Sequence, residues 1–133
     1  MAMTLCDTNI IIEIYRGNQA IKNELDNIGQ ANITLSDISC AELFYGAKNK
    51  TELQKIINDI RLLNTLPINR EISNKGVRLV QDYCLSHKMT IEDALIAATA
   101  LYHDIELFTL NLKDFMYIPE IKLYHFPHPT IAD

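Results

Sequence analysis

Short apolar segments that alternate with longer amphipathic ones restrict the possible folds of this chain more than any other feature. The strand-like segments lie at 3–6, 33–35, 66–68, 107–109 and 121–126. The helix-like segments lie at 9–16, 18–28, 41–47, 51–64, 71–87 and 91–103. Strands that alternate with helices are typical of a parallel sheet with helices on both faces. We therefore expect a three-layer α/β/α sandwich with a central parallel sheet of four to five strands, in a single domain over residues 1–133.

The two longest expected helices carry apolar residues at helical spacing, which predicts their buried faces. In 51–64 the inward residues are expected to be Leu53, Ile56, Ile57, Ile60 and Leu63. In 71–87 they are expected to be Ile72, Val77, Leu79, Val80 and Leu85.

The composition favours a folded protein outside the membrane. Hydrophobic residues make up 48% of the chain, which is enough to bury a core and argues against disorder. No apolar run approaches the roughly 18 residues of a membrane span, and the N-terminal residues lack the pattern of a signal peptide. We therefore expect a cytoplasmic protein that does not interact with a membrane.

Neither the cysteines nor the histidines show the spacing of a soft-metal site. The three cysteines are odd in number and far apart, so we expect reduced, buried thiols and not disulfides or a zinc site. His125 and His128 lie in a tail with nearby prolines, where exposed loop residues are expected.

The net charge is −5, which argues against binding of nucleic acid by bulk positive charge alone. The basic candidates for such contacts, Arg16, Lys48 and Lys50, are scattered along the chain. An enzyme that acts on nucleic acid is still compatible with this charge, because a cluster of acids that holds cations contributes to it.

The expected parallel sheet predicts where a ligand site lies. Ligands of such sheets bind beyond the C-terminal ends of the strands. This rule selects Asp7, the Ser36-Asp37 turn and the segment from Asn111 to Asp114. Asp7 is equally explained as the N-cap of the following helix, although Thr8 is able to cap it as well.

Two further acids stand out by their surroundings. Glu42 is the only charge between Asp37 and Lys48, and an isolated acid among apolar residues is costly to bury unless it is paired or binds a metal. Asp93 precedes a small apolar run at 94–100. Its alternative role is to favour the helix dipole, which Glu92 can also do.

Carboxylates from distant parts of the chain are thus expected at one edge of the sheet. Carboxylates that lie close together repel each other, and a divalent cation removes that cost. Ligand oxygens without Cys or His select Mg²⁺ or Mn²⁺ over Zn²⁺. Such an ion activates water and stabilises charge on a phosphoryl oxygen, as hydrolysis of a phosphodiester requires.

Four segments resemble, in order, the motifs of the PIN-domain nucleases. They are Asp7-Thr8-Asn9 after the first strand, the "ELxxGA"-like helix at 41–47, the "DxLIAATA"-like run at 93–100, and the closing "T-x-N-x-x-D-F" segment at 109–115. The resemblance covers essentially the whole chain, and its length and motifs are similar to those of the VapC-like toxins of toxin–antitoxin pairs.

This resemblance implies a metal-dependent endoribonuclease that acts as the toxin of a type II pair. Asp7 and Asp93 would be the main ligands of Mg²⁺ or Mn²⁺, and Glu42 would complete the acidic pocket. A metal-activated water would then attack the phosphodiester of RNA. The resemblance also implies a homodimer and a small antitoxin protein that covers the site.

The polar residues around the acids receive roles from the same resemblance. Thr8 and Asn9 would shape the rim of the pocket, and Thr109 would bind the scissile phosphate or orient a carboxylate. Many PIN domains have an acid where this sequence has Asn111. Related toxins have Asn there and an acid three residues later, as Asp114 is here, so either Asp114 or Asn111 is the fourth site residue.

Two alternatives remain open on the sequence. The first is a PIN-fold module that binds RNA but has weakened catalysis, which the Asn at position 111 permits. The second is a small metal-dependent phosphatase, which also has an Asp after its first strand. Phosphatases of this kind normally have a second acid two residues on, and this chain has Asn9 there.

Overall fold

The computed structural model describes residues 3–127 and contains four strands, six α-helices and two short 3-10 helices in that range. The strands are β1 (Thr4–Cys6), β2 (Ile33–Ser36), β3 (Asn64–Leu66) and β4 (Glu106–Phe108). The α-helices are α1 (Thr8–Tyr15), α2 (Gln19–Ile28), α3 (Asp37–Tyr45), α4 (Lys50–Ile60), α5 (Arg70–His87) and α6 (Ile91–His103). The 3-10 helices are η1 (Gln30–Asn32) and η2 (Leu112–Asp114).

All four strands pair in parallel, in the order β3-β2-β1-β4, so the predicted parallel sheet is confirmed. The strand order reverses at β1, because the chain moves from β1 to β2 and β3 on one side and returns to β4 on the other. This reversal is where open α/β sheets bind their ligands. The register pairs Cys6 with Phe108, so the residues that follow β1 and β4 leave the sheet side by side.

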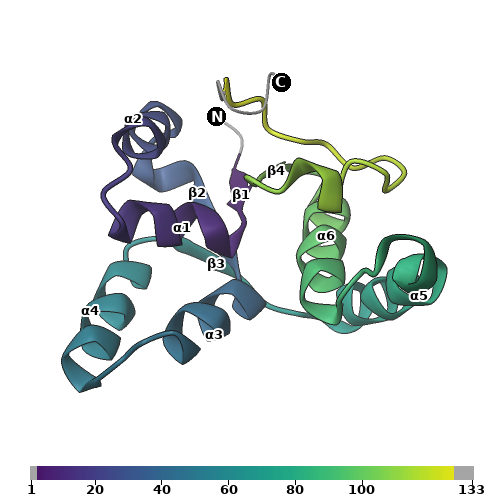
Figure 1. The fold of residues 1–133 in the computed structure, drawn as a ribbon, viewed down its shortest axis with the longest axis horizontal. Coiled ribbons are helices and arrows are strands. Elements are labelled where there is room, and N and C mark those ends of the chain that lie inside the picture. Colours follow the sequence, from purple (N-terminus) through teal and green to yellow (C-terminus); the bar gives the residue numbers. More distant parts are fainter. Residues whose placement is uncertain (1–2, 128–133) are drawn as a thin grey trace.

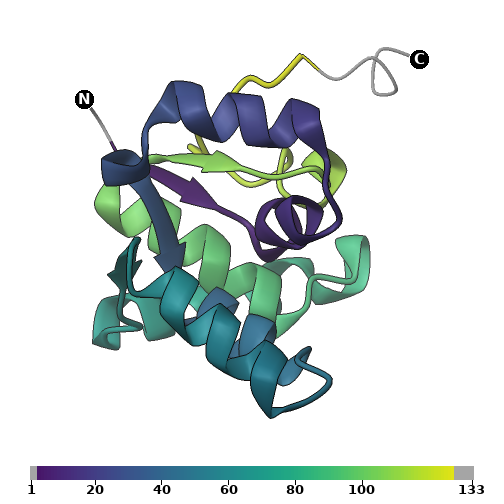
Figure 2. The same ribbon diagram turned by 90° about the vertical axis from the view of Figure 1, so that its left-hand side faces the viewer.

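Two apolar cores lie on opposite faces of the sheet, as a three-layer sandwich requires. Successive strand residues point to opposite faces. Leu5 and Leu107 enter the core under α5 and α6, whereas Cys6 and Phe108 enter the core beneath α1 to α4. Figure 1 shows α5 and α6 on one side of the strands and α1, α2 and α4 on the other, and Figure 2 shows the same layers after a quarter turn.

Helices α5 and α6 approach each other closely. A Cβ added at Gly76 of α5 would lie 2.8 Å from Leu95 Cδ2 of α6, so the absence of a side chain permits this approach. The small residues Ala94, Ala97 and Ala98 of α6 are fully buried. Thr90 caps α6 by accepting a hydrogen bond from the Asp93 amide at 3.2 Å. The first turn of α6, which carries Asp93, is therefore firmly held.

Several element boundaries differ from the sequence-based expectation. Helix α3 begins at Asp37 instead of residue 41, because Ser36 caps it by accepting a hydrogen bond from Ile38 N. Helix α4 ends at Ile60, and β3 occupies Asn64–Leu66 instead of 66–68. The strand begins earlier because the three residues pair in register with Thr34, Leu35 and Ser36 of β2. Local propensity alone does not reveal that pairing.

A fifth strand at 121–126 does not form. This segment pairs with β4 only at Leu123, where Leu107 donates to Lys122 O at 2.8 Å and accepts from Tyr124 N at 2.9 Å. Its aromatic residues pack on Phe108 instead, with ring centroids of Tyr124 and Phe126 at 4.8 and 5.4 Å. Side-chain packing, and not a ladder of backbone hydrogen bonds, therefore holds this segment against β4.

The expected inward face of α5 is partly wrong. Val77 and Leu85 are 59% and 95% exposed, because α5 buries a narrow stripe of Ile72, Gly76 and Leu79 against α6.

Among the thiols, Cys6 and Cys40 are buried as expected, but Cys84 is exposed. His125 is exposed, as predicted, and His128 lies outside the described residues. Within residues 3–127, no helix has both the length and the hydrophobicity needed to cross a membrane.

Candidate active site

Asp7 lies at the C-terminal end of β1, where the strand order reverses. Its amide donates to Phe108 O at 2.8 Å, which fixes the backbone against β4. Its side chain is only 6% exposed, and it does cap α1, because Oδ1 accepts a hydrogen bond from Thr8 N at 2.7 Å. The two interpretations of Asp7 are therefore compatible, since the cap uses only one of its carboxylate oxygens.

Thr109 binds the other carboxylate oxygen of Asp7. Its hydroxyl donates to Asp7 Oδ2 at 2.8 Å and accepts from Asn111 N at 3.0 Å. The Asn9 amide group lies 3.5 Å from the same hydroxyl, and Asn9 Oδ1 accepts from Leu110 N at 3.4 Å. These bonds join the segment after β1 to the segment after β4. The structure thus gives Thr109 the position of an orienting residue for Asp7.

Glu42 reaches the same place from α3. Thr8 Oγ1 donates to Glu42 Oε1 at 2.6 Å, and Glu42 is half-buried. Thr8 therefore contacts two of the acids, through its amide to Asp7 and through its hydroxyl to Glu42. The isolated acid among apolar residues does not simply point into solvent.

Asp93 joins the cluster from the first turn of α6. Burial raises the pKa of its carboxyl to about 6, and the negative charges of Asp7, Asp114, Glu42 and Glu92 add to this shift. A helix N-terminus favours a carboxylate, but burial and repulsion outweigh that effect here. The pKa of Asp7 is raised as well, mainly by burial and further by Glu42 and Asp114, while the bonds from Thr109 and Thr8 oppose the rise.

The segment after β4 adds Asp114 to this group of acids. Asp114 lies in η2 and is exposed, and its charge raises the pKa of both Asp7 and Asp93. Asn111 is also exposed, and its backbone amide binds Thr109. Asp114 therefore acts on the other acids through its charge, whereas Asn111 contacts the network through its backbone amide.

The acids are close enough to interact electrostatically, but their side chains do not form a complete metal-coordination site. Among residues 3–127, no group of three or more His, Cys, Asp or Glu side chains is arranged to hold a metal ion. The donor set is nonetheless composed of oxygen alone, and its repulsion is uncompensated by any Lys or Arg ion pair within the described chain.

Two features next to the acids were not recognised from the sequence. The first is a stack of aromatic rings at Tyr83, His87 and Tyr117. Burial raises the pKa of Tyr117, and the nearby charges of Asp93 and Asp114 add to this rise. On the other side, α1, α3 and α4 line a groove of about 470 Å³ that includes Glu42. Neither feature has a sequence signal, because both depend on contacts between segments that are far apart in the sequence.

The groove gathers basic residues that are scattered in the sequence. Arg16, Lys48 and Lys55 line it together with the apolar residues Ile12, Leu43 and Ile56. Lys50, the third basic candidate from the sequence, is not among its lining residues. Glu42 and Glu52 also line the groove, so it is partly apolar, carries charges of both signs and reaches the acidic cluster at Glu42.

Comparisons with known proteins agree with this geometry. The family model described as "PIN domain" matches residues 4–118. The Ribonuclease VapC1 of Rickettsia felis is 34% identical over 128 residues, which cover 90% of this chain and 92% of that protein. The Ribonuclease VapC19 of Mycobacterium tuberculosis is 32% identical over 124 residues, with coverage of 90% and 98%.

Solved structures lead to the same group. A chain in a toxin–antitoxin complex from Klebsiella pneumoniae has a TM-score of 0.75 and 33% identity, over 89% of this chain and 94% of that chain. A chain of VapBC2 from Rickettsia felis, bound to a promoter DNA fragment, has a TM-score of 0.78 and 26% identity over 94% and 99%. This chain therefore belongs to the PIN-domain family, within the group of the VapC ribonuclease toxins.

Proposed function

We propose that this chain is a Mg²⁺- or Mn²⁺-dependent endoribonuclease that acts as the toxin of a type II toxin–antitoxin pair and functions as a single PIN domain. The observation that carries the proposal is the buried Asp7, held by Thr8 and Thr109 within a cluster of acids that repel each other. Such perturbed acids concentrate at functional sites. The relatives named as ribonucleases provide the class of reaction.

The chemistry of the donor set fits a hard divalent cation. Asp7, Glu42, Asp93 and Asp114 offer only oxygen, which suits Mg²⁺ or Mn²⁺. The repulsion that raises the pKa of Asp93 to about 6 is the cost that a cation removes. We assign Asp7, Asp93 and Glu42 as the metal-binding residues, and Asp114 as a further acid at the open side of the cluster.

A bound cation would lower the pKa of a water molecule and stabilise negative charge on the phosphoryl group. The residues of the chain then have separate tasks. Thr109 fixes the orientation of Asp7, and Thr8 holds Glu42 toward the same point. Asn9 and Asn111, which lie around Thr109, form the rim that the phosphodiester approaches. The observed hydrogen bonds support this division, and we propose that the scissile phosphate binds beyond the end of β1.

The partner we propose is a small antitoxin that occupies the groove between α1, α3 and α4. The groove combines apolar walls with charges of both signs, so it suits an amphipathic segment whose acidic residues meet Arg16, Lys48 and Lys55 and whose basic residues meet Glu42 and Glu52. It also includes Glu42, so a segment bound there lies against the acidic cluster. The similar solved chains come from toxin–antitoxin complexes. A homodimer is proposed on the same family grounds.

The decisive test is cleavage of a labelled single-stranded RNA by the purified chain, free of antitoxin. We expect cleavage with Mg²⁺, none with EDTA, and recovery when Mg²⁺ is added back. Asp93→Asn should remove the activity, whereas Asp104→Asn, at the other end of α6, should keep it. A folded protein that binds RNA but never cleaves it would favour the alternative of a weakened RNA-binding module.

A further inference from the structure

We infer that Tyr83, His87 and Tyr117 form a stacking platform for one unpaired base of the RNA, next to the phosphate that is cleaved. This inference rests on the proposed function and specifies how its substrate is held. Aromatic side chains bind single-stranded nucleic acid by stacking on the faces of its bases. We call these three residues the aromatic platform.

The rings of the aromatic platform already form an ordered stack. The imidazole of His87 lies parallel to the ring of Tyr117, with centroids 3.7 Å apart and an angle of 13° between the planes. Tyr83 meets both rings edge-on, at 4.9 Å from Tyr117 and 5.8 Å from His87. Ser86 Oγ lies 2.8 Å from His87 Nδ1, which fixes the orientation of the imidazole. A base that joins this stack would meet a preorganised surface, which limits the entropy lost on binding.

The stack has a free end. His87 is exposed, whereas Tyr83 and Tyr117 are half-buried. Tyr117 covers one face of the imidazole, and the Tyr83 centroid is farther away at 5.8 Å with its plane at 76° to the imidazole, so His87 keeps exposed surface that Tyr117 does not cover. The imidazole has the π-character to stack on a single nucleobase.

The aromatic platform lies at the acidic cluster and not elsewhere on the surface. Tyr117 follows η2, and the fully buried Phe115, directly after the exposed Asp114, anchors that segment. His87 ends α5, and the buried Met89 and the cap Thr90 connect it directly to the first turn of α6, which carries Asp93. The charges of Asp93 and Asp114 also reach the Tyr117 hydroxyl. A base on His87 would therefore belong to a nucleotide beside the scissile phosphate.

Stacking is the kind of contact that this chain needs. With a net charge of −5 and a cluster of acids at the site, attraction of the phosphate backbone is limited. Base stacking does not depend on that attraction. Lys88 and Lys113 flank the aromatic platform in sequence, and within the described residues neither forms an ion pair, so both are available for neighbouring phosphates.

The test uses a single-stranded RNA 12-mer that carries 2-aminopurine at one position in turn, because stacking quenches the fluorescence of this base. The protein is Asp7→Asn, so that the RNA stays intact. We expect quenching at one position, and loss of this quenching with roughly 10-fold weaker binding when His87→Ala is added. His87→Phe, which keeps an aromatic face, should restore both. The matched control is Tyr102→Ala, since Tyr102 forms an edge-on pair with His103 at the far end of α6.

In the catalytically competent chain, His87→Ala should raise KM for RNA by a similar factor and leave kcat within about two-fold. Equal losses in His87→Ala and His87→Phe, accompanied by a lower Tm, would show that the stack only anchors α5 and would overturn the inference. Cleavage by the unmodified chain without any His87-dependent quenching would also overturn it, with the proposed function intact. Quenching without cleavage by the unmodified chain would support the platform and contradict the nuclease.

Discussion

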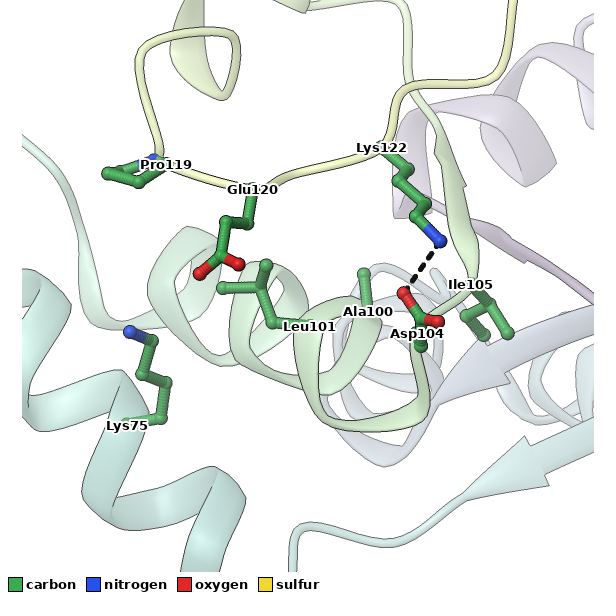
Figure 3. Close-up of a pocket in the computed structure, with 8 residues that line it drawn as sticks. All are labelled: Lys75, Ala100, Leu101, Asp104, Ile105, Pro119, Glu120 and Lys122. Atoms are coloured by element: carbon green, nitrogen blue, oxygen red, sulfur yellow. Dashed lines mark ion pairs between the residues drawn. The ribbon is translucent and has the colours of Figure 1, made fainter.

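Both ends of α6 carry charged groups, but the charges repel each other at one end and are paired with opposite charges at the other. At the N-terminal end, Asp93 faces other acids, and burial together with their repulsion raises its pKa to about 6. At the C-terminal end, Asp104 is exposed and forms an ion pair with Lys122, with 2.7 Å between Lys122 Nζ and Asp104 Oδ1. Lys75 and Glu120 line the same cavity of about 230 Å³ (Figure 3).

The difference separates ordinary surface electrostatics from a functional site. In the C-terminal cavity, two lysines face two acids, so the charges compensate one another in contact with solvent (Figure 3). In the N-terminal cluster, like charges are partly removed from water, and no Lys or Arg of residues 3–127 forms an ion pair with them. Proteins retain such unfavourable repulsion between acids at sites that bind a ligand or catalyse a reaction. Uncompensated charge, and not the number of acids, marks the site.

The largest expected difference between the two ends is in activity. Asp7→Asn should lower RNA cleavage by at least about 100-fold, because even indirect partners of metal ligands change activity by 10–100-fold. Asn keeps the shape of Asp, so Thr8 and Thr109 retain partners. Asp104→Asn should leave the rate unchanged. Rates are measured on a labelled RNA with Mg²⁺, and circular dichroism controls for folding. Equal losses in both variants would abolish the proposed distinction.

A second expected difference is in the response to Mg²⁺. A cation that binds only the folded state at about ten times its Kd adds about 1.4 kcal/mol to the free energy of unfolding, or a few degrees in Tm. We expect this increase in the unmodified chain and in Asp104→Asn, and its loss in Asp93→Asn. Thermal unfolding followed by circular dichroism, with and without MgCl₂, provides the measurement. An increase that persists in Asp93→Asn would remove Asp93 from the metal-binding residues.

The third prediction concerns pH in the absence of divalent cations. The folded-state pKa of Asp93, about 6, is above the ordinary value of 3.8, so the folded chain holds the proton more tightly than the unfolded chain. Asp93 therefore destabilises the fold increasingly as pH rises from about 4 through about 6, and the penalty is constant above that. Because Asp93 is half-exposed, solvent screening limits the penalty to about 1 kcal/mol.

Urea unfolding at several pH values tests this sign. The advantage of Asp93→Asn over the unmodified chain should grow between pH 4 and pH 7 in EDTA. An advantage that shrinks over that interval would mean that Asp93 is stabilised as a carboxylate, and that its neighbours do not act as described.

The smallest effect belongs to the ion pair at the C-terminal end of α6. Lys122 and Asp104 are 55% and 78% exposed, and surface pairs of this kind contribute about 0–1 kcal/mol. Lys122→Met should therefore change the free energy of unfolding by less than about 0.5 kcal/mol and should not alter RNA cleavage. Chemical unfolding of the two proteins side by side measures this. A decrease above about 2 kcal/mol in the free energy of unfolding would show that Asp104 needs its ion pair with Lys122, as a buried charge does.

Much of the fold follows from local pattern. The alternation of short strands and helices was sufficient for the parallel sheet, since each strand after the first is preceded by helix long enough for a crossover. The prediction was wrong where long-range pairing decides the boundary. Strand β3 shifted to match β2, and the segment at 121–126 kept only the bridge at Leu123, because packing on Phe108 replaced the ladder. The exposure of Val77 and Leu85 depends on which stripe of α5 meets α6.

The sequence by itself determined that Asp7 would stand at the end of the first strand and that the chain would bring acids toward one edge of a parallel sheet. Only the tertiary structure decided which residues meet there. The register of β1 and β4 places Thr109 on Asp7 across 102 positions of sequence, and it also brings Asp114 into the acidic cluster. The stack of His87 on Tyr117 arises in the same way. Local propensity depends on neighbours in the chain. These contacts instead depend on burial of both apolar faces of the sheet, because that burial fixes how the helices pack on the sheet and how β1 and β4 pair.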